Sequence, residues 1–185
     1  MSSAAAKLIE SFSNAEGIAG AVEDVADKYQ MAGSHAKSYP LHRHVVEHWL
    51  GHERAIWCQM KAIMAQLRLG DLAKAEQELG GLLSGFAGHK ELGPVVHEVV
   101  EEYRDTGAHE EGRELFGYIL ENWDEGPDTM LELQVGIALQ SIKLGELDKA
   151  DAAAEKLIAD YNDHPKIAKG LFQIAEQHLD NPANV

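Results

Sequence analysis

Cysteine, proline and aromatic residues are scarce in this chain of 185 residues, which has one cysteine, five prolines and 6% aromatic side chains. The single Cys58 excludes an internal disulfide framework. No apolar run approaches the roughly 20 residues that span a bilayer. Residues 2–12 lack both the basic start and the long apolar centre of a secretory signal peptide. The sequence therefore predicts no membrane insertion, and it leaves the cellular compartment unknown.

Basic residues are also few, because 16 Lys and Arg face 31 Asp and Glu and the net charge is −15. The excess is uneven: residues 1–92 hold 11 acidic and 9 basic side chains (−2), and residues 93–185 hold 20 and 7 (−13). Without a basic stripe that releases counterions, nucleic-acid binding is not expected. An acidic surface can attract a basic partner, although solvation of an exposed helical surface explains most of these charges.

One pattern occurs twice. The segment from Leu67 to Ala75 reads LRLGDLAKA, and the later segment from Ile142 to Ala150 reads IKLGELDKA. Each copy is typical of a helix that ends at Leu-Gly, followed by a tight turn and a second helix opened by an acidic residue. Because the similarity continues along most of the chain, the sequence predicts stacked helix hairpins, which form a solenoid.

The glycines of the predicted turns are Gly33, Gly70, Gly107 and Gly145, which follow one another at nearly equal intervals. Apolar residues between them recur at helical spacing, and no segment alternates with a period of two. We predict an all-α domain over residues 1–185, with about ten antiparallel helices near 2–12, 16–31, 39–50, 52–69, 72–86, 91–105, 109–123, 128–144, 147–161 and 166–179.

The hairpins resemble those of the tetratricopeptide repeat (TPR) family. That family places an aromatic residue four positions before the turn glycine, as at Tyr29 and Tyr103, and a small residue five positions after it, as at Ala75 and Ala150. Gly112 and Phe116 also match the family pattern. The interval between turn glycines is somewhat longer here than is usual in that family. The resemblance implies a right-handed α-α superhelix and a scaffold or adaptor that binds a partner peptide or helix on its concave face.

In that family the first helix of each hairpin lines the concave face. Placing these helices by their apolar stripes gives nine candidate contacts for a partner segment, namely Lys61, Met64, Arg68, His97, Glu98, Glu101, Arg104, Leu139 and Lys143. Glu98 and Glu101 turn toward the concave face in this register, so the partner is expected to carry Lys or Arg.

Neither end has a polar helix that would cap a solenoid. Leu8, Ile9 and Phe12 near the start are apolar, and so are Leu171, Phe172 and Ile174 near the end. We therefore expect the chain to be a fragment of a longer array. As an alternative function, its terminal helices drive weak self-association into a homo-oligomer.

Ten histidines invite a metal interpretation. His44 and His48 stand four positions apart on one predicted helical face, and His52 follows them, which is a spacing suited to Zn²⁺. Because the helix is interrupted near Gly51 and Cys58 is not in a ligand pair, we expect no cofactor and no catalysis. A metal-binding protein or enzyme remains a minor alternative. Another four histidines recur at matching turns and suggest a structural role in ending helices (His35, His89, His109 and His164).

Overall fold

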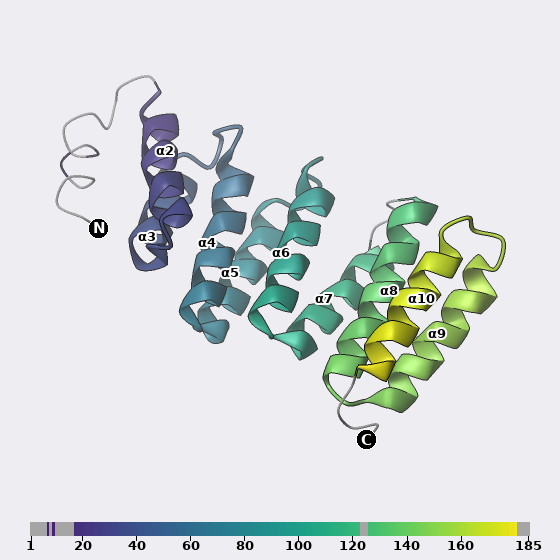
Figure 1. The fold of residues 1–185 in the computed structure, drawn as a ribbon. Helices are drawn as coiled ribbons and strands as arrows, with labels where there is room; N and C mark the ends of the chain where they lie inside the picture. Colours follow the sequence, from purple (N-terminus) through teal and green to yellow (C-terminus); the bar gives the residue numbers. More distant parts are fainter. Residues whose placement is uncertain (1–6, 8, 10–16, 123–125, 181–185) are drawn as a thin grey trace. The chain divides into compact units, whose positions relative to one another are not determined.

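The computed structural model describes residues 7, 9, 17–122 and 126–180. Within these ranges it contains helices and turns and no strand, which confirms the all-α prediction. The helices, coloured along the sequence in Figure 1, are α2 (Ile18–Met31), α3 (His35–His48), α4 (Ala55–Leu69), α5 (Leu72–Gly85), α6 (Leu92–Thr106), α7 (His109–Asn122), α8 (Pro127–Lys143), α9 (Leu147–Tyr161) and α10 (Ile167–Leu179).

Two compact units divide the chain: unit 1 is Met1–Glu102 and unit 2 is Tyr103–Val185. The division falls within α6. The prediction of a single domain and that of a superhelix both stay predictions. The predicted first helix, 2–12, lies mostly outside the described residues, as do Leu8 and Phe12 of the proposed apolar end and Trp123 of the predicted helix 109–123.

The four turn glycines have positive φ, as the repeat predicts. At Gly70, with φ +74°, the amides of Gly70 and Asp71 bond to the carbonyls of Leu67 and Gln66, each at 3.0 Å. This pair of bonds satisfies carbonyls that the end of α4 would otherwise leave without partners. The Asp71 side chain then accepts a hydrogen bond from the Lys74 amide at 3.3 Å and caps α5.

Unit 1 is built from helices that contact their neighbours in chain order, α2 on α3, α3 on α4 and α4 on α5. One core cluster joins Val22, Leu41, Val45 and Cys58, with partly buried Ile9 against it. In α6, Val95, Val96, Val99 and Val100 are fully buried. This stripe at helical spacing fixes which side of α6 is exposed.

Unit 2 repeats the arrangement, with α7 on α8, α8 on α9, and α10 against both α8 and α9. Its core cluster includes Leu131, Ala138, Ile142 and Leu157. Helices α7 and α8 approach closely at Gly136, which has no side chain. A Cβ atom on Gly136 would lie 2.6 Å from the Phe116 ring.

Two details differ from the sequence-based expectation. Helix α3 begins at His35 instead of residue 39, so Pro40 lies inside it. The earlier start is held by bonds from the Lys37 and Ser38 amides to the Ser34 carbonyl and by burial of Ser38. Pro40 is the sixth residue of α3 and has no amide to donate to the preceding turn, a cost that the burial of Ser38 and Leu41 outweighs. His35, likewise, begins a helix instead of ending one.

The second difference concerns His109, which is the first residue of α7. His89 and His164 do lie in the turns that follow α5 and α9. In α5, Gly80 and Gly81 do not mark a close contact between helices. A Cβ on Gly80 would meet nothing within 4 Å, and one on Gly81 would meet only Gln59 Nε2 at 3.5 Å, an ordinary contact.

Candidate functional site

The nine predicted contact residues fall into both units. Six lie in unit 1 (Lys61, Met64, Arg68, His97, Glu98 and Glu101), and three lie in unit 2 (Arg104, Leu139 and Lys143). Each set is therefore considered within its own unit.

Lys61 on α4 is engaged by carboxylates of α2. Its Nζ donates to both oxygens of Asp27 at 2.7 Å and to Glu23 Oε1 at 3.3 Å. Glu23 is almost fully buried and also pairs with Arg54 at 3.1 Å. Sequence reasoning missed both acidic partners, because they are distant in the chain and lie on another helix. The Lys61 charge is thus compensated within unit 1.

This cluster continues to His42, whose side chain is fully buried. The His42 Nε2 atom bonds to Gln30 Oε1 at 3.0 Å and lies 3.7 Å from Asp27 Oδ1. Burial, and then the nearby Lys61 charge, lowers the pKa of His42 to about 4. The Asp27 carboxylate acts in the opposite direction and is outweighed. His42 is therefore neutral in the folded protein at neutral pH.

Cys58 lies beside the same charges and is fully buried. Burial raises the pKa of its thiol to about 12, and the Glu23 carboxylate adds to the rise. A thiol that remains protonated and inaccessible is a packing group, because nucleophilic cysteines require the thiolate.

Arg68, near the end of α4, forms an ion pair with Glu102 of α6. Along α6, Glu98 is exposed, and His97 and Glu101 are partly buried. These side chains alternate with the buried valines as the sequence predicts. The α6 part of unit 1 thus presents acidic side chains, and Arg68, a predicted cation of the same unit, is paired with Glu102.

In unit 2, Lys143 and Arg104 are exposed. Arg104 Nε lies 3.7 Å from Asp105 Oδ1 on the same helix. Leu139 is partly buried and packs against the core cluster of α8, α9 and α10. It therefore serves the core of unit 2 as well as its surface.

The structure does not gather His44, His48 and His52 into one site. The rings of His44 and His48 stack with centroids 3.9 Å apart, and His48 Nδ1 donates to the His44 carbonyl at 3.1 Å. His52 Nδ1 instead accepts from the Arg54 amide at 3.3 Å. Across the described ranges, no three or more His, Cys, Asp or Glu side chains form a group that could hold a metal ion.

A second polar network joins α3, α4 and α5 around Glu78. This nearly buried carboxylate accepts from Tyr39 at 2.7 Å, from Arg43 at 2.9 Å and from Gln59 at 2.8 Å. Gln59 also donates to the Glu78 carbonyl at 2.7 Å. Burial, and then the bond to Glu78, raises the pKa of Tyr39. The network ties three helices together and is a structural feature, since its members are satisfied by one another.

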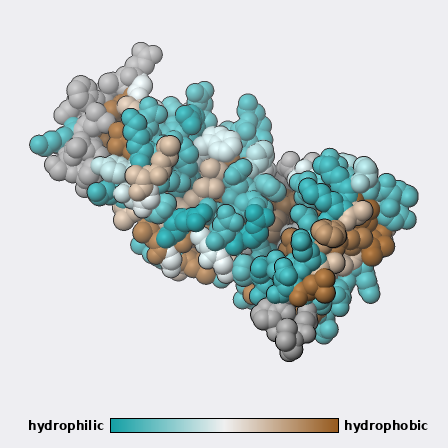
Figure 2. Space-filling model, viewed as in Figure 1, coloured by the Kyte–Doolittle hydropathy of each residue, from teal (hydrophilic) through white to brown (hydrophobic). Residues whose placement is uncertain are grey.

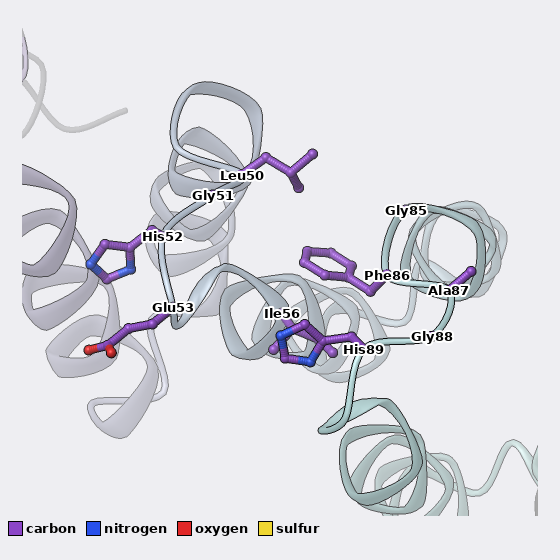
Figure 3. Close-up of a pocket in the computed structure, with 10 residues that line it drawn as sticks. All are labelled: Leu50, Gly51, His52, Glu53, Ile56, Gly85, Phe86, Ala87, Gly88 and His89. Carbon is purple, nitrogen blue, oxygen red and sulfur yellow. The ribbon is translucent and has the colours of Figure 1, made fainter.

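A pocket of about 440 Å³ opens in unit 1 between the segment that joins α3 to α4 and the segment that follows α5. Figure 3 shows the side chains of Leu50 and Phe86 at this pocket, with those of Ile56 and His89 below Phe86 in the view. His52 and Glu53 lie on the opposite side and point away from Phe86. Sequence reasoning missed this pocket, although the recurrence of His89 and His164 at matching turns marks its position.

A groove of about 440 Å³ also lies along α9 and α10 in unit 2, lined by Ala154, Leu171, Ile174, Ala175 and Leu179 among others. Phe172 and Leu179 of α10 are 66% and 81% exposed. Figure 2 shows hydrophobic side chains gathered on the part of unit 2 formed by α9 and α10. This surface combines the groove with the exposed apolar side chains of α10.

No helix in the described parts of the chain is long and apolar enough to cross a membrane. No protein-family model matches the chain, and no curated protein matches it.

Proposed function

We propose that the protein is a non-catalytic interaction module, a scaffold or adaptor that binds a segment of a partner protein carrying Lys or Arg. The proposal combines the resemblance of the hairpins to tetratricopeptide repeats with the charge of unit 1. In this proposal the hairpins continue as a right-handed superhelix, and the partner lies on its concave face.

The observation that carries the proposal is the distribution of charge around α6. Glu98 is exposed on the side of α6 opposite its buried valines, and Glu101 lies one turn further along. Of the four basic side chains predicted to line this surface, the two in unit 1 are bound within that unit, Lys61 by Asp27 and Arg68 by Glu102. The exposed Glu98 is an acidic group with which a basic side chain of a partner segment would pair.

The test selects binding peptides from an unbiased library and compares the parent protein with the variant Glu98→Lys plus Glu101→Lys. Selected peptides are expected to be enriched in Lys and Arg. The double reversal should weaken their binding by about tenfold or more, as expected for reversed charge pairs at an interface.

A matched control carries the same change of charge on another helix, as Glu110→Lys plus Glu114→Lys on α7, where both side chains are exposed. This control should bind like the parent. Peptides without basic character, or equal losses in the two double variants, would contradict the proposal. A library that yields no binder would also contradict it.

A second candidate function is self-association through α10. It is favoured by the exposure of Phe172 and Leu179 beside the apolar groove of unit 2, because exposed apolar patches mark interaction surfaces. Sedimentation over a range of concentrations should then show a rising mass, and Phe172→Ser should lower that rise. A constant mass up to about millimolar protein would remove this candidate.

A further inference from the structure

The turn that follows α5 and the turn that follows α9 are copies of one structure. In unit 1 the His89 amide donates to the Phe86 carbonyl at 2.9 Å, and in unit 2 the His164 amide donates to the Tyr161 carbonyl at 2.8 Å. Each aromatic ring meets its histidine edge-on, with centroids 6.2 Å apart in unit 1 and 6.0 Å apart in unit 2.

The histidines of the two turns accept the same backbone hydrogen bond, from the amide two residues later. His89 Nδ1 accepts from the Glu91 amide at 3.2 Å, and His164 Nδ1 accepts from the Lys166 amide at 3.3 Å. Because Nδ1 accepts in both turns, the ring proton of each neutral imidazole is on Nε2. Nε2 is thus the atom available for a partner outside the turn.

In unit 2 this partner is Asp128, in the first turn of α8. Its Oδ1 lies 2.9 Å from His164 Nε2, and its Oδ2 lies 2.8 Å from Lys166 Nζ. The bond to Lys166, the larger cause, and the nearby His164 hold the pKa of Asp128 below its usual range. A carboxylate and a cation thus join the turn after α9 to the start of α8.

Unit 1 has a carboxylate at the position of Asp128 but no cation at the position of Lys166. In the register that aligns His89 with His164, Glu53 stands where unit 2 has Asp128, and Glu91 stands where unit 2 has Lys166. Glu53 points away from Phe86 (Figure 3), and no ion pair to Glu53 is found within the described part of the chain. Unit 2 has an ion pair between Asp128 and Lys166 at this position, and unit 1 has a pocket lined by Leu50, Phe86 and other residues.

We propose that this pocket is a docking site for a partner segment in which a Lys or Arg stands next to a large apolar side chain. The basic side chain takes the place that Lys166 occupies in unit 2, between Glu53 and Glu91. The apolar side chain packs between Leu50 and Phe86. The occupant is a protein segment, because adjacent side chains of a peptide can supply both a cation for the carboxylates and an apolar group for Leu50 and Phe86.

The chemistry of this fit follows from the internal comparison. Glu53 is exposed, so its side chain can turn toward an incoming cation. Glu91 pairs with Lys90, whose Nζ is 3.8 Å away and whose side chain is 86% exposed. An exposed pair of this kind is easily displaced. Docking of an apolar group between Leu50 and Phe86 removes apolar surface from water. The inference rests on the proposed function and adds to it a position and a sequence preference.

The probe is the blocked peptide acetyl-Gly-Ser-Lys-Phe-Ser-Gly-amide, titrated into the full chain labelled with ¹⁵N and followed by NMR. Amide shifts are expected to change around Gly51–Glu53 and Gly88–Glu91. Replacing Lys by Glu, or Phe by Ser, in the peptide should each weaken binding by about tenfold. Changes confined to other residues, or equal binding of the three peptides, would overturn the proposal.

Variants of the protein test the missing cation directly. Glu91→Lys recreates the residue found at the same position in unit 2 and should abolish binding, because its ammonium can pair with Glu53. Glu91→Gln keeps the size of the side chain and should weaken binding by about threefold. The control Glu76→Lys, at an exposed position of α5, should bind like the parent.

Circular dichroism establishes whether each variant is folded. If Glu91→Lys does not fold, Glu91→Gln and the peptide series test the proposal. Binding of the parent peptide that is unchanged in Glu91→Gln and Glu91→Lys would overturn the proposal. If peptides selected from a library depend on Glu98 and Glu101 but not on Glu91, the pocket is wrong and the proposed function stands. If no basic peptide binds anywhere, both fall.

Discussion

The turn after α4 offers a sharp test of the fold, since its central residue and a nearby glycine should respond in opposite ways to the same substitution. Gly70 adopts φ +74°, and a Cβ atom placed on it would meet nothing within 4 Å. Gly80 lies inside α5, and a Cβ atom there would also meet nothing within 4 Å. Neither Gly70→Ala nor Gly80→Ala therefore creates a clash, and only backbone effects distinguish them.

Two effects determine the expected magnitudes. Alanine reduces the conformational freedom of the unfolded chain at both positions, which stabilises the protein by about 0.4–1 kcal/mol where the native conformation allows it. At Gly70 the left-handed conformation costs alanine about 1–2 kcal/mol. Gly80→Ala should thus stabilise unit 1 by up to about 1 kcal/mol, and Gly70→Ala should be destabilising by about 0.5–1 kcal/mol.

The assay is equilibrium unfolding in urea, followed by circular dichroism and by tryptophan fluorescence, to which Trp57 on α4 contributes. The free energies of unfolding of the two variants should differ by about 1–2 kcal/mol, with the parent between them. Equal midpoints for Gly70→Ala and Gly80→Ala would refute the turn geometry assigned to Gly70.

Two further predictions concern the polar networks of unit 1. Because His42 is neutral in the folded state with a pKa of about 4, against 6.5 for an unperturbed histidine, its contribution to stability is complete above pH 6.5 and is lost as the pH falls toward 4. Unfolding curves between pH 7 and 4 should show this loss, on the order of 2–3 kcal/mol, and His42→Gln should flatten it; equal slopes for both proteins would contradict the assignment. Glu78→Ala leaves Arg43, Tyr39 and Gln59 without their shared acceptor and should be destabilising by about 1–3 kcal/mol. Glu76→Ala, its exposed neighbour on α5, should have an effect within about 0.5 kcal/mol, and a Glu78→Ala effect this small in urea unfolding would show that the network adds little.

The local features of the fold were predictable from the sequence because they depend on neighbouring residues. The repeated Leu-Gly-acid pattern predicts a left-handed glycine at Gly70 and Gly145, and both are observed. The valine spacing of residues 95–100 likewise predicts the buried face of α6. Helix starts were less predictable: Pro40 suggested a later start for α3, and packing of Ser38 overrides it.

The partners of the charged residues could not be predicted. Lys61 has the cationic character expected of a contact residue, but its partner Asp27 lies far away in the chain, on another helix. No local spacing indicates such a pair. The fold sets it by bringing α2 beside Lys61. The pocket next to Phe86 could not be predicted for a related reason. In the sequence it is marked only by Glu91, which stands where the other repeat has Lys166. This difference becomes informative only when the structure shows that the two turns are alike.

If unit 1 binds a basic partner segment, the affinity for that segment depends on the salt concentration. The measurement is the dissociation constant of one library-selected peptide for the parent protein, between about 0.05 and 0.5 M NaCl, beside Glu98→Lys plus Glu101→Lys. We expect the affinity of the parent to fall steeply as salt screens the acidic surface, and the double variant to bind weakly at every salt concentration. An affinity that salt leaves unchanged, equal in the two proteins, would contradict the claim that unit 1 binds a basic partner segment.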